Sequence, residues 1–290
     1  MNQSHRSSRA IKWFLVVVMI SGALFHSHLV VVAQTATSAM AQGKADNEYQ
    51  TAAILWTQSA AEYRALAYQT FVLARLRLDQ DLQQRRARRG VRSRAALIVD
   101  ADETVLDNSR FQAELLLRGL PYESAGWRAW CERAEAGAVP GAVDFLKYAA
   151  QRGVRVFYIT NRRQPEKAGT VLNLKKLGFP DVSEETVMIR EDGTTSSKET
   201  RRKKVAQRYR IALLVGDNLN DFNDNFAGKS IAERAEQVDR ERAEFGVRFI
   251  VLPNPMYGDW ESAVYQYKSG LTEEQKHAYR RAALKGLSSQ

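Results

Sequence analysis

Five short, almost wholly apolar runs, separated by longer stretches of helical pattern, limit the folds open to this chain. The runs cover residues 95–99, 154–160, 186–189, 211–215 and 247–252. They are continuously apolar rather than alternating, which is typical of strands buried on both faces of a parallel sheet with crossover helices. We therefore predict an α/β protein of three layers, in which helices cover both faces of a parallel sheet.

Two stretches stand outside this alternation. Residues 47–86 carry apolar and aromatic side chains at three- and four-residue spacing, without Gly or Pro, and this pattern predicts helix. Residues 110–140 are rich in Trp and small side chains, and we expect them to form an insertion over the sheet. The predicted organisation is a helical segment at 42–93, a core at 94–270 that includes the insertion, and a helical tail at 271–290.

The first 41 residues have the layout of an export signal. Three basic residues and no acidic one precede an apolar run at 13–25, and small residues follow up to Ala41. We expect cleavage near Gln42 and an exported protein, either periplasmic or associated with the cell envelope. An uncleaved membrane anchor is the alternative, because residues 13–33 are about long enough to span a bilayer.

Histidine and cysteine are too scarce to carry the chemistry of this chain. It has one Cys and four His, and three of the His lie within the first 28 residues. Cys131 alone can form no internal disulfide and no Cys-rich zinc site. Catalysis must therefore use carboxylates, Lys, Ser, Thr or backbone groups, which disfavours Ser-His-Asp hydrolases and phosphatases with a His nucleophile.

Polar residues follow three of the predicted strands directly. In chain order they are Asp100, Asp102, Thr160, Asn161, Asp217 and Asp221. Ligands of open parallel sheets bind at the carboxyl ends of the strands, so these side chains are expected to converge. A single Asp in such a place is often only a helix cap, but four converging carboxylates repel one another and require a cation. Oxygen ligands without His or Cys favour Mg²⁺.

The same segments resemble a known family. Residues 100–109 read DADETVLDNS, residues 158–162 read YITNR, and residues 216–218 read GDN. These runs resemble the haloacid dehalogenase superfamily and, more narrowly, the class C bacterial acid phosphatases, exported 5′-nucleotidases typified by an outer-membrane lipoprotein. The resemblance implies a Rossmann-like fold with a small helical cap.

The resemblance continues at 62–69, 138–143 and 257–261, and so covers most of the chain beyond the signal. Two features depart from the family pattern. The Cys of the lipoprotein is missing, so lipid anchoring is not carried over. Asn220 stands where a further acidic residue is common, which affects the surroundings of the metal.

The resemblance also implies roles in a phosphatase that forms an aspartyl-phosphate. Asp100 would be the nucleophile, and Asp102 would protonate the leaving oxygen and then activate water. Thr160 would donate a hydrogen bond to the phosphoryl group. Lys198 would hold the phosphoryl oxygens, and a lysine of the 201–204 run is the alternative.

For the metal, the resemblance implies that Mg²⁺ is held by the side chains of Asp100 and Asp217 and by the backbone carbonyl of Asp102. Asp221 would support these ligands.

For the substrate, the resemblance favours a small phosphomonoester, either a 5′-nucleotide or nicotinamide mononucleotide. Trp130 and Tyr257 are candidates to stack on its base, and Asn161 is a further substrate-binding candidate. Packing in the core or the cap is the alternative for these aromatic residues, and we expect Trp127 to be structural. A homodimer and membrane association through the N-terminus are possible by analogy.

Two other classes of function stay open at this point. One is an exported, non-catalytic protein that binds a nucleotide or a metal on the same fold, which the presence of both Asp100 and Asp102 disfavours. The other is a module that binds polyanions through its basic runs at 85–89 and 201–204, given the net charge of +10. Such runs are usually solvated, and no nucleic acid is expected as a partner.

Overall fold

The computed structural model describes residues 47–87 and 94–285. Its strands are β1 (Ala95–Val99), β2 (Leu106–Asp107), β3 (Gly137–Ala138), β4 (Arg155–Ile159), β5 (Val187–Met188), β6 (Arg210–Gly216) and β7 (Phe249–Val251). Its α-helices are α2 (Thr51–Ser59), α3 (Ala61–Ala87), α4 (Ser109–Arg118), α5 (Ser124–Arg133), α6 (Ala142–Gln151), α7 (Lys167–Lys176), α8 (Glu199–Ala206), α9 (Ile231–Arg240), α10 (Asp259–Val264) and α11 (Glu273–Ala283). Four short 3₁₀ turns, η1 (Glu48–Gln50), η2 (Gln164–Glu166), η3 (Leu219–Asp221) and η4 (Asp224–Phe226), complete the described elements.

Five strands form one parallel sheet in the order β5-β4-β1-β6-β7. The predicted α/β fold with a central parallel sheet is thereby confirmed. Each strand falls within one residue of a predicted apolar run, apart from β7, which is shorter than its run at both ends. Where that run begins, the chain turns: the N–H of Val247 donates to the carbonyl of Glu244, and the N–H of the preceding Gly246 donates to the carbonyl of Phe249.

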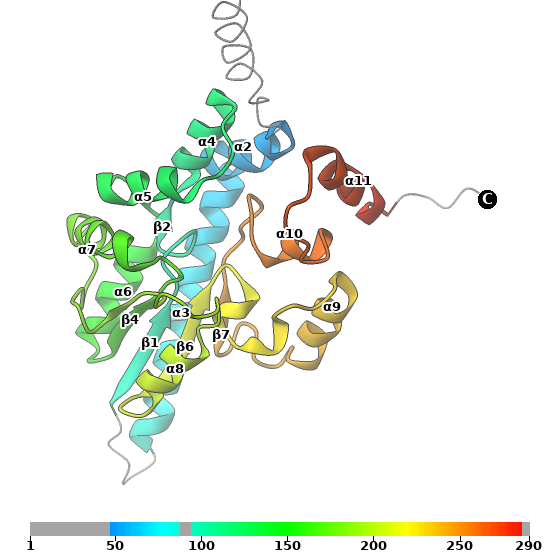
Figure 1. Ribbon diagram of the computed structural model, residues 1–290. Coiled ribbons are helices and arrows are strands. Elements are labelled where there is room, and N and C mark those ends of the chain that lie inside the picture. Colours follow the sequence, from blue (N-terminus) through cyan, green and yellow to red (C-terminus); the bar gives the residue numbers. More distant parts are fainter. Residues whose placement is uncertain (1–46, 88–93, 286–290) are drawn as a thin grey trace, which may run out of the picture. The chain divides into compact units, whose positions relative to one another are not determined.

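Helices cover both faces of this sheet, as Figure 1 shows for α3, α6 and α8. On one face, Leu97 and Val99 of β1 pack in a cluster that includes Phe145 of α6. On the other face, Ile98 packs in a second cluster with Val205 of α8. Strand β1 is buried throughout, which explains why its sequence is continuously apolar.

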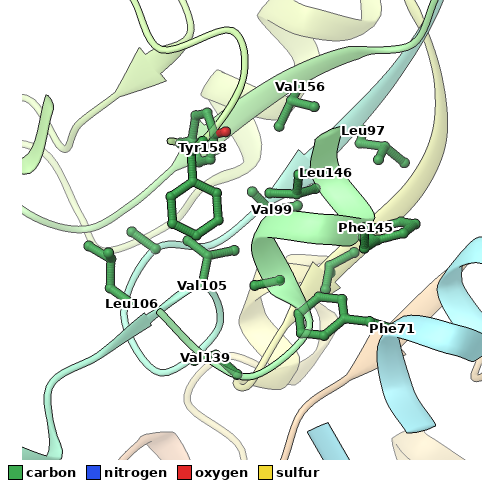
Figure 2. Packing of buried hydrophobic residues seen from close by; sticks show 14 of the residues in the cluster. Phe71, Leu97, Val99, Val105, Leu106, Val139, Phe145, Leu146, Val156 and Tyr158 are labelled. Carbon is green, nitrogen blue, oxygen red and sulfur yellow. The ribbon is translucent and has the colours of Figure 1, made fainter. Parts of the chain in front are cut away.

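The larger core cluster continues beyond the end of β1. Figure 2 shows Val105, Leu106 and Val139 packed near Val99 and Tyr158. The backbone of this segment is fixed as well, because the carbonyl of Ala101 accepts hydrogen bonds from the N–H groups of Val105 and Leu106. The loop that leaves β1 is therefore held rigidly, which matters for the residues that it carries.

The expected N-terminal helix is two helices that meet at Ala60. Ala60 has extended backbone with ψ of 124°, so the chain bends there without Gly or Pro. The spacing did not indicate which side of α3 is buried. Val72 and Leu76 are exposed, whereas Phe71 and Leu78 are buried. Both faces of this helix carry apolar residues, so spacing alone could not distinguish them.

Residues 110–140, expected as an insertion, lie mainly in α4, α5 and β3. Strand β3 pairs antiparallel with β2, which closes the base of the insertion beside the loop after β1. Helix α5 also packs tightly against α7: a Cβ on Gly169 would lie 2.1 Å from the carbonyl oxygen of Cys131. These contacts attach the insertion to the core on two sides.

The expected export signal at 1–41 and residues 286–290 of the expected tail lie outside the described residues. Within the described parts of the chain, we find no helix that combines the length and the apolar character needed to cross a membrane.

Candidate active site

Acidic residues meet at the carboxyl edge of the sheet. Asp100 follows β1 and Asp217 follows β6, and these two strands are neighbours. Asp221 closes the next 3₁₀ turn, η3. The carboxylate oxygens of the three residues lie within 4.8 Å of one another. The convergence expected from the strand order therefore exists.

The turn after β6 directs Asp221 back toward the strand. The backbone N–H of Asn218 donates to Asp221 Oδ2 at 2.9 Å. Gly216 makes this approach possible, because a Cβ at that position would lie 2.3 Å from the same oxygen. Only glycine leaves room for the carboxylate here.

Replacing Gly216 with Ala should therefore displace Asp221 from the cluster. We expect Gly216→Ala to lower kcat by about 10²-fold, because misplacing a site group by about 1 Å can cost that much. Steady-state hydrolysis of p-nitrophenyl phosphate measures it. Gly126→Ala is the matched control, since a Cβ there meets nothing within 4 Å. Equal, small effects of both substitutions would contradict the requirement for this close approach.

Lys198 lies among these carboxylates. It precedes α8, and its side chain is buried. Its Nζ donates to Asp221 Oδ1 at 2.6 Å and also to Asp100 Oδ1. Of the lysines considered from the sequence, the structure brings Lys198 to the nucleophile candidate, whereas the side chain of Lys203 is 73% exposed and pairs with Glu199.

The electrostatics of the cluster show a shortage of positive charge. Burial raises the pKa of Asp100 well above its ordinary range, and the nearby Asp221 and Asp217 raise it further against the effect of Lys198. Burial and Asp221 raise the pKa of Asp217 to about 7. Burial opposes the charge of Lys198, but the pairs with Asp100 and Asp221 outweigh it and raise that pKa. One lysine does not neutralise three carboxylates.

The donor set fits a hard divalent cation. Three carboxylates supply the cluster, and neither His nor Cys belongs to it. Mg²⁺ is usually bound by a few carboxylates together with waters and substrate phosphate. Two of these carboxylates are also pre-oriented: Asn218 holds Asp221, while Thr104 Oγ1 and Asn254 Nδ2 each donate to Asp217 at 2.9 Å.

The side chain of Asp102 bonds to residues outside this cluster. Its Oδ1 accepts hydrogen bonds from Arg162 and from Asn108 Nδ2, and its Oδ2 accepts one from Thr160 Oγ1 at 3.2 Å. The sequence analysis expects Asp102 to bind the metal through its backbone carbonyl, and these side-chain contacts are compatible with that expectation. Thr160, expected to donate to a phosphoryl group, donates to Asp102 here.

The expected substrate-binding residues lie in different surroundings. Trp130 is 2% exposed, and its indole N–H donates to Asn108 Oδ1 at 2.8 Å. It also stacks on Phe111, which is the packing role given above as the alternative for this residue. Asn161 is exposed, but its amide bonds to Ser196 and Arg201. Tyr257 is partly buried in the loop after β7.

Two residues that sequence reasoning missed join this site. Arg162 stands within the YITNR run itself and is 3% exposed, with its guanidinium on Asp102. Asn254 follows β7 and reaches Asp217. Polar residues that follow parallel strands converge at one edge of the sheet. Applying this rule to the predicted strand at 247–252 as well would have identified Asn254.

A parallel sheet that presents an Asp-x-Asp loop, a buried lysine and further aspartates at its carboxyl edge defines a hydrolase of the haloacid dehalogenase type. Within that superfamily, the chain belongs to subfamily IIIB, the acid phosphatases, whose family model matches residues 20–260. This membership places it among the phosphoric monoester hydrolases, a metal-dependent group.

Solved structures agree with this assignment. The class C acid phosphatase from Bacillus anthracis with tungstate bound is 40% identical and superposes with a TM-score of 0.78, over 83% of this chain and 98% of that one. A second structure of the Bacillus anthracis enzyme gives a TM-score of 0.77 at the same identity and coverage.

Two plant proteins are more distant relatives. Acid phosphatase 1 of Solanum lycopersicum is 26% identical over 55% of this chain, and the stem 31 kDa glycoprotein of Glycine max is 23% identical over the same share. The chain spans 57% and 58% of their lengths.

Proposed function

We propose that this protein is a Mg²⁺-dependent acid phosphatase that hydrolyses nucleoside 5′-monophosphates, or related mononucleotides, through an aspartyl-phosphate. The arrangement of Asp100, Lys198 and Asp221 at the sheet edge supports the proposal most directly. A buried carboxylate that contacts a buried lysine, next to two further carboxylates, is suited to receive a phosphoryl group and a cation together. The tungstate in the Bacillus anthracis relative, a tetrahedral oxyanion like phosphate, is compatible with such a site.

The chain's own groups divide the reaction between them. Asp100 attacks phosphorus, the bond to the ester oxygen breaks, and a phosphoryl group is joined to Asp100. Asp102 gives a proton to the departing oxygen and then takes one from the water that hydrolyses the acyl phosphate. Lys198 balances negative charge on the transferring oxygens. Asp100 and Asp221 accept hydrogen bonds from the lysine and hold it in place for this role.

Asp100 and Asp217, the backbone carbonyl of Asp102 and the supporting Asp221 would hold Mg²⁺. When bound, the cation supplies electrostatic stabilisation of the phosphoryl oxygens. Thr104 and Asn254 orient the Asp217 carboxylate for this task, and Asn218 orients Asp221.

The loop after β7 supports the nucleotide part of the proposal. Asn254 ties this loop to Asp217, and a Cβ on Gly258 would lie 3.6 Å from Asn218 Nδ2. Tyr257 lies between these two residues in the sequence, so its backbone is held near the carboxylate cluster. It is the stacking candidate that remains, because Trp130 is buried.

Substitution of Tyr257 tests this preference. We expect Tyr257→Ala to reduce kcat/KM for a nucleoside 5′-monophosphate by about 5- to 150-fold, the worth of one base stack of about 1–3 kcal/mol. The kcat/KM for a simple alkyl phosphate should stay within about twofold, because that substrate has no ring. Phosphate release from both substrates is measured in parallel, with Tyr279→Ala on α11 as a matched control. Equal losses on both substrates would refute the stacking role.

A panel of nucleotides, dinucleotide cofactors and sugar phosphates tests the substrate class as a whole. Phosphate release from none of them would favour a non-catalytic binding protein on the same fold. The proposal includes export to the periplasm or cell envelope, on the basis of the charge and hydropathy pattern at 1–41.

A further inference from the structure

Arg162 makes an ion pair with Asp102 that the reaction scheme above does not use. Its Nη2 donates to Asp102 Oδ1 at 2.7 Å, and its Nε donates to the same oxygen at 3.0 Å. The side chain of Arg162 is 1% exposed and that of Asp102 is 18% exposed. Nε also reaches Asp102 Oδ2 at 3.3 Å, so the guanidinium contacts both oxygens and fixes the direction of the carboxylate as well as attracting it.

The arginine is itself held from several sides. Nη1 donates to Thr170 Oγ1 at 3.0 Å on α7, and the guanidinium lies over the ring of Trp127, 5.1 Å from its centroid. Its backbone N–H donates to Thr160 Oγ1 at 3.1 Å, and this hydroxyl donates to Asp102. These contacts leave Arg162 little freedom, so the orientation of Asp102 is determined by the fold.

A second support reaches Asp102 from the insertion. Asn108 Nδ2 donates to Asp102 Oδ1 at 2.9 Å, and Asn108 Oδ1 accepts from the indole of Trp130 at 2.8 Å. Arg162 Nη2 also donates to Asn108 Oδ1, at 3.3 Å. The buried Trp130 therefore acts on Asp102 through Asn108.

The two oxygens of Asp102 differ as a result. Oδ1 accepts from Arg162 Nε, Arg162 Nη2 and Asn108 Nδ2, which occupies its acceptor capacity. From the described residues, Oδ2 accepts from Thr160 at 3.2 Å and more distantly from Arg162 Nε at 3.3 Å. Oδ2 accepts fewer and longer hydrogen bonds than Oδ1, so it is the oxygen better placed to carry an exchangeable proton.

We propose that Arg162 is the positioning residue of the general acid: together with Asn108, it occupies Asp102 Oδ1 and turns Oδ2 toward the leaving group. This inference deepens the proposed function and depends on it, because it takes Asp102 to be the proton donor. Among the described residues, the guanidinium of Arg162 bonds to Asp102, Asn108 and Thr170 and to none of the carboxylates of the cluster, so we take it to act on the reaction through Asp102.

Loss of this positioning should slow the hydrolysis of some phosphate esters more than others, depending on the leaving group. An ester whose alcohol departs easily as an anion, such as p-nitrophenyl phosphate, needs little help from an acid. An alkyl phosphate needs the proton at the moment of cleavage, and a positioned acid contributes about 10²–10⁴-fold. Loss of the correct Asp102 orientation should therefore slow alkyl esters far more than nitrophenyl esters.

The test compares kcat/KM over a series of aryl phosphates and one alkyl phosphate in Arg162→Lys, which keeps the charge and loses the fork. We expect a decrease of less than about tenfold for p-nitrophenyl phosphate and of about 10²-fold or more for the alkyl phosphate. Asn108→Ser, which removes the other support, should shift the series in the same direction and gives a second readout if Arg162→Lys does not fold. In an Asp102→Asn background, Arg162→Lys should add no further selectivity.

Arg202→Gln is the matched control, because Arg202 is also buried and ion-paired, but it contacts Glu199, Asp224 and the backbone carbonyls of Asn220 and Asp221 rather than Asp102. Any loss in this variant should be equal across the series. Equal losses across the series in both Arg162→Lys and Asn108→Ser would overturn the positioning role. Equal losses across the series in Asp102→Asn would instead show that Asp102 is not the acid. That result would contradict the proposed function itself, and it differs from the result that contradicts only the role of Arg162.

Discussion

Asp100→Asn should reduce phosphatase activity by at least about 10⁴-fold. The amide cannot attack phosphorus, so the reaction loses its covalent route rather than one stabilising contact. The substitution also removes a carboxylate from the cluster and breaks the pair with Lys198. One substitution thus removes the nucleophile, a carboxylate of the cluster and an ion pair of Lys198 together.

Rapid-quench labelling with a ³²P-labelled phosphomonoester measures the intermediate directly. Wild-type protein should retain acid-stable label in the steady state, whereas Asp100→Asn should retain none. Asp144→Asn, at an exposed aspartate of α6, is the matched control and should behave as wild type. Label or full turnover in Asp100→Asn would refute the assignment of the nucleophile. Unfolding curves of the two variants check that the fold is intact.

The sequence predicted the parts of the fold that follow from burial on both faces of the sheet. β1 coincides with its apolar run because all five residues are buried, so no polar position interrupts the pattern. The positions of Asp100 and Asp217 followed from the same pattern, because residues after neighbouring parallel strands share an edge. The family motif then supplied the roles that geometry alone does not assign.

Side-chain surroundings were harder to predict, because they depend on contacts between distant segments. Trp130 appears in the sequence as an aromatic residue within an insertion, and nothing local indicates that its indole bonds to Asn108. The same limit applies to Arg162, whose role becomes visible when β4 and the loop after β1 lie side by side. The helix α3 was predicted, but its buried face was not, because apolar residues lie on both of its faces.

Removal of divalent metal should abolish activity, and Mg²⁺ should restore it. Without the cation, three carboxylates share one lysine, and the phosphoryl group of the substrate adds further negative charge. We expect a chelator to reduce turnover of p-nitrophenyl phosphate below about 1% of its initial value. Asp217→Asn should raise the Mg²⁺ concentration needed for half-maximal activity by at least about 10²-fold, because perturbing even an outer metal contact costs about 10–100-fold. Asp239→Asn on α9 is the control and should leave this concentration unchanged.

The pH dependence of metal binding tests more directly whether Asp217 binds the cation. The pKa of Asp217 is raised to about 7 in the metal-free fold, chiefly by burial and by Asp221, so the folded protein binds a proton there more tightly than the unfolded chain does. This proton therefore stabilises the metal-free fold at low pH, and the contribution is lost as pH rises toward 7. Mg²⁺ binds the deprotonated carboxylate, so it must displace the proton at low pH and need not do so at high pH. The increase in Tm on adding Mg²⁺ should accordingly be larger at about pH 8 than at about pH 5, as measured by calorimetry. An increase that is the same at both values, or larger at the acidic one, would show that Asp217 does not bind the metal.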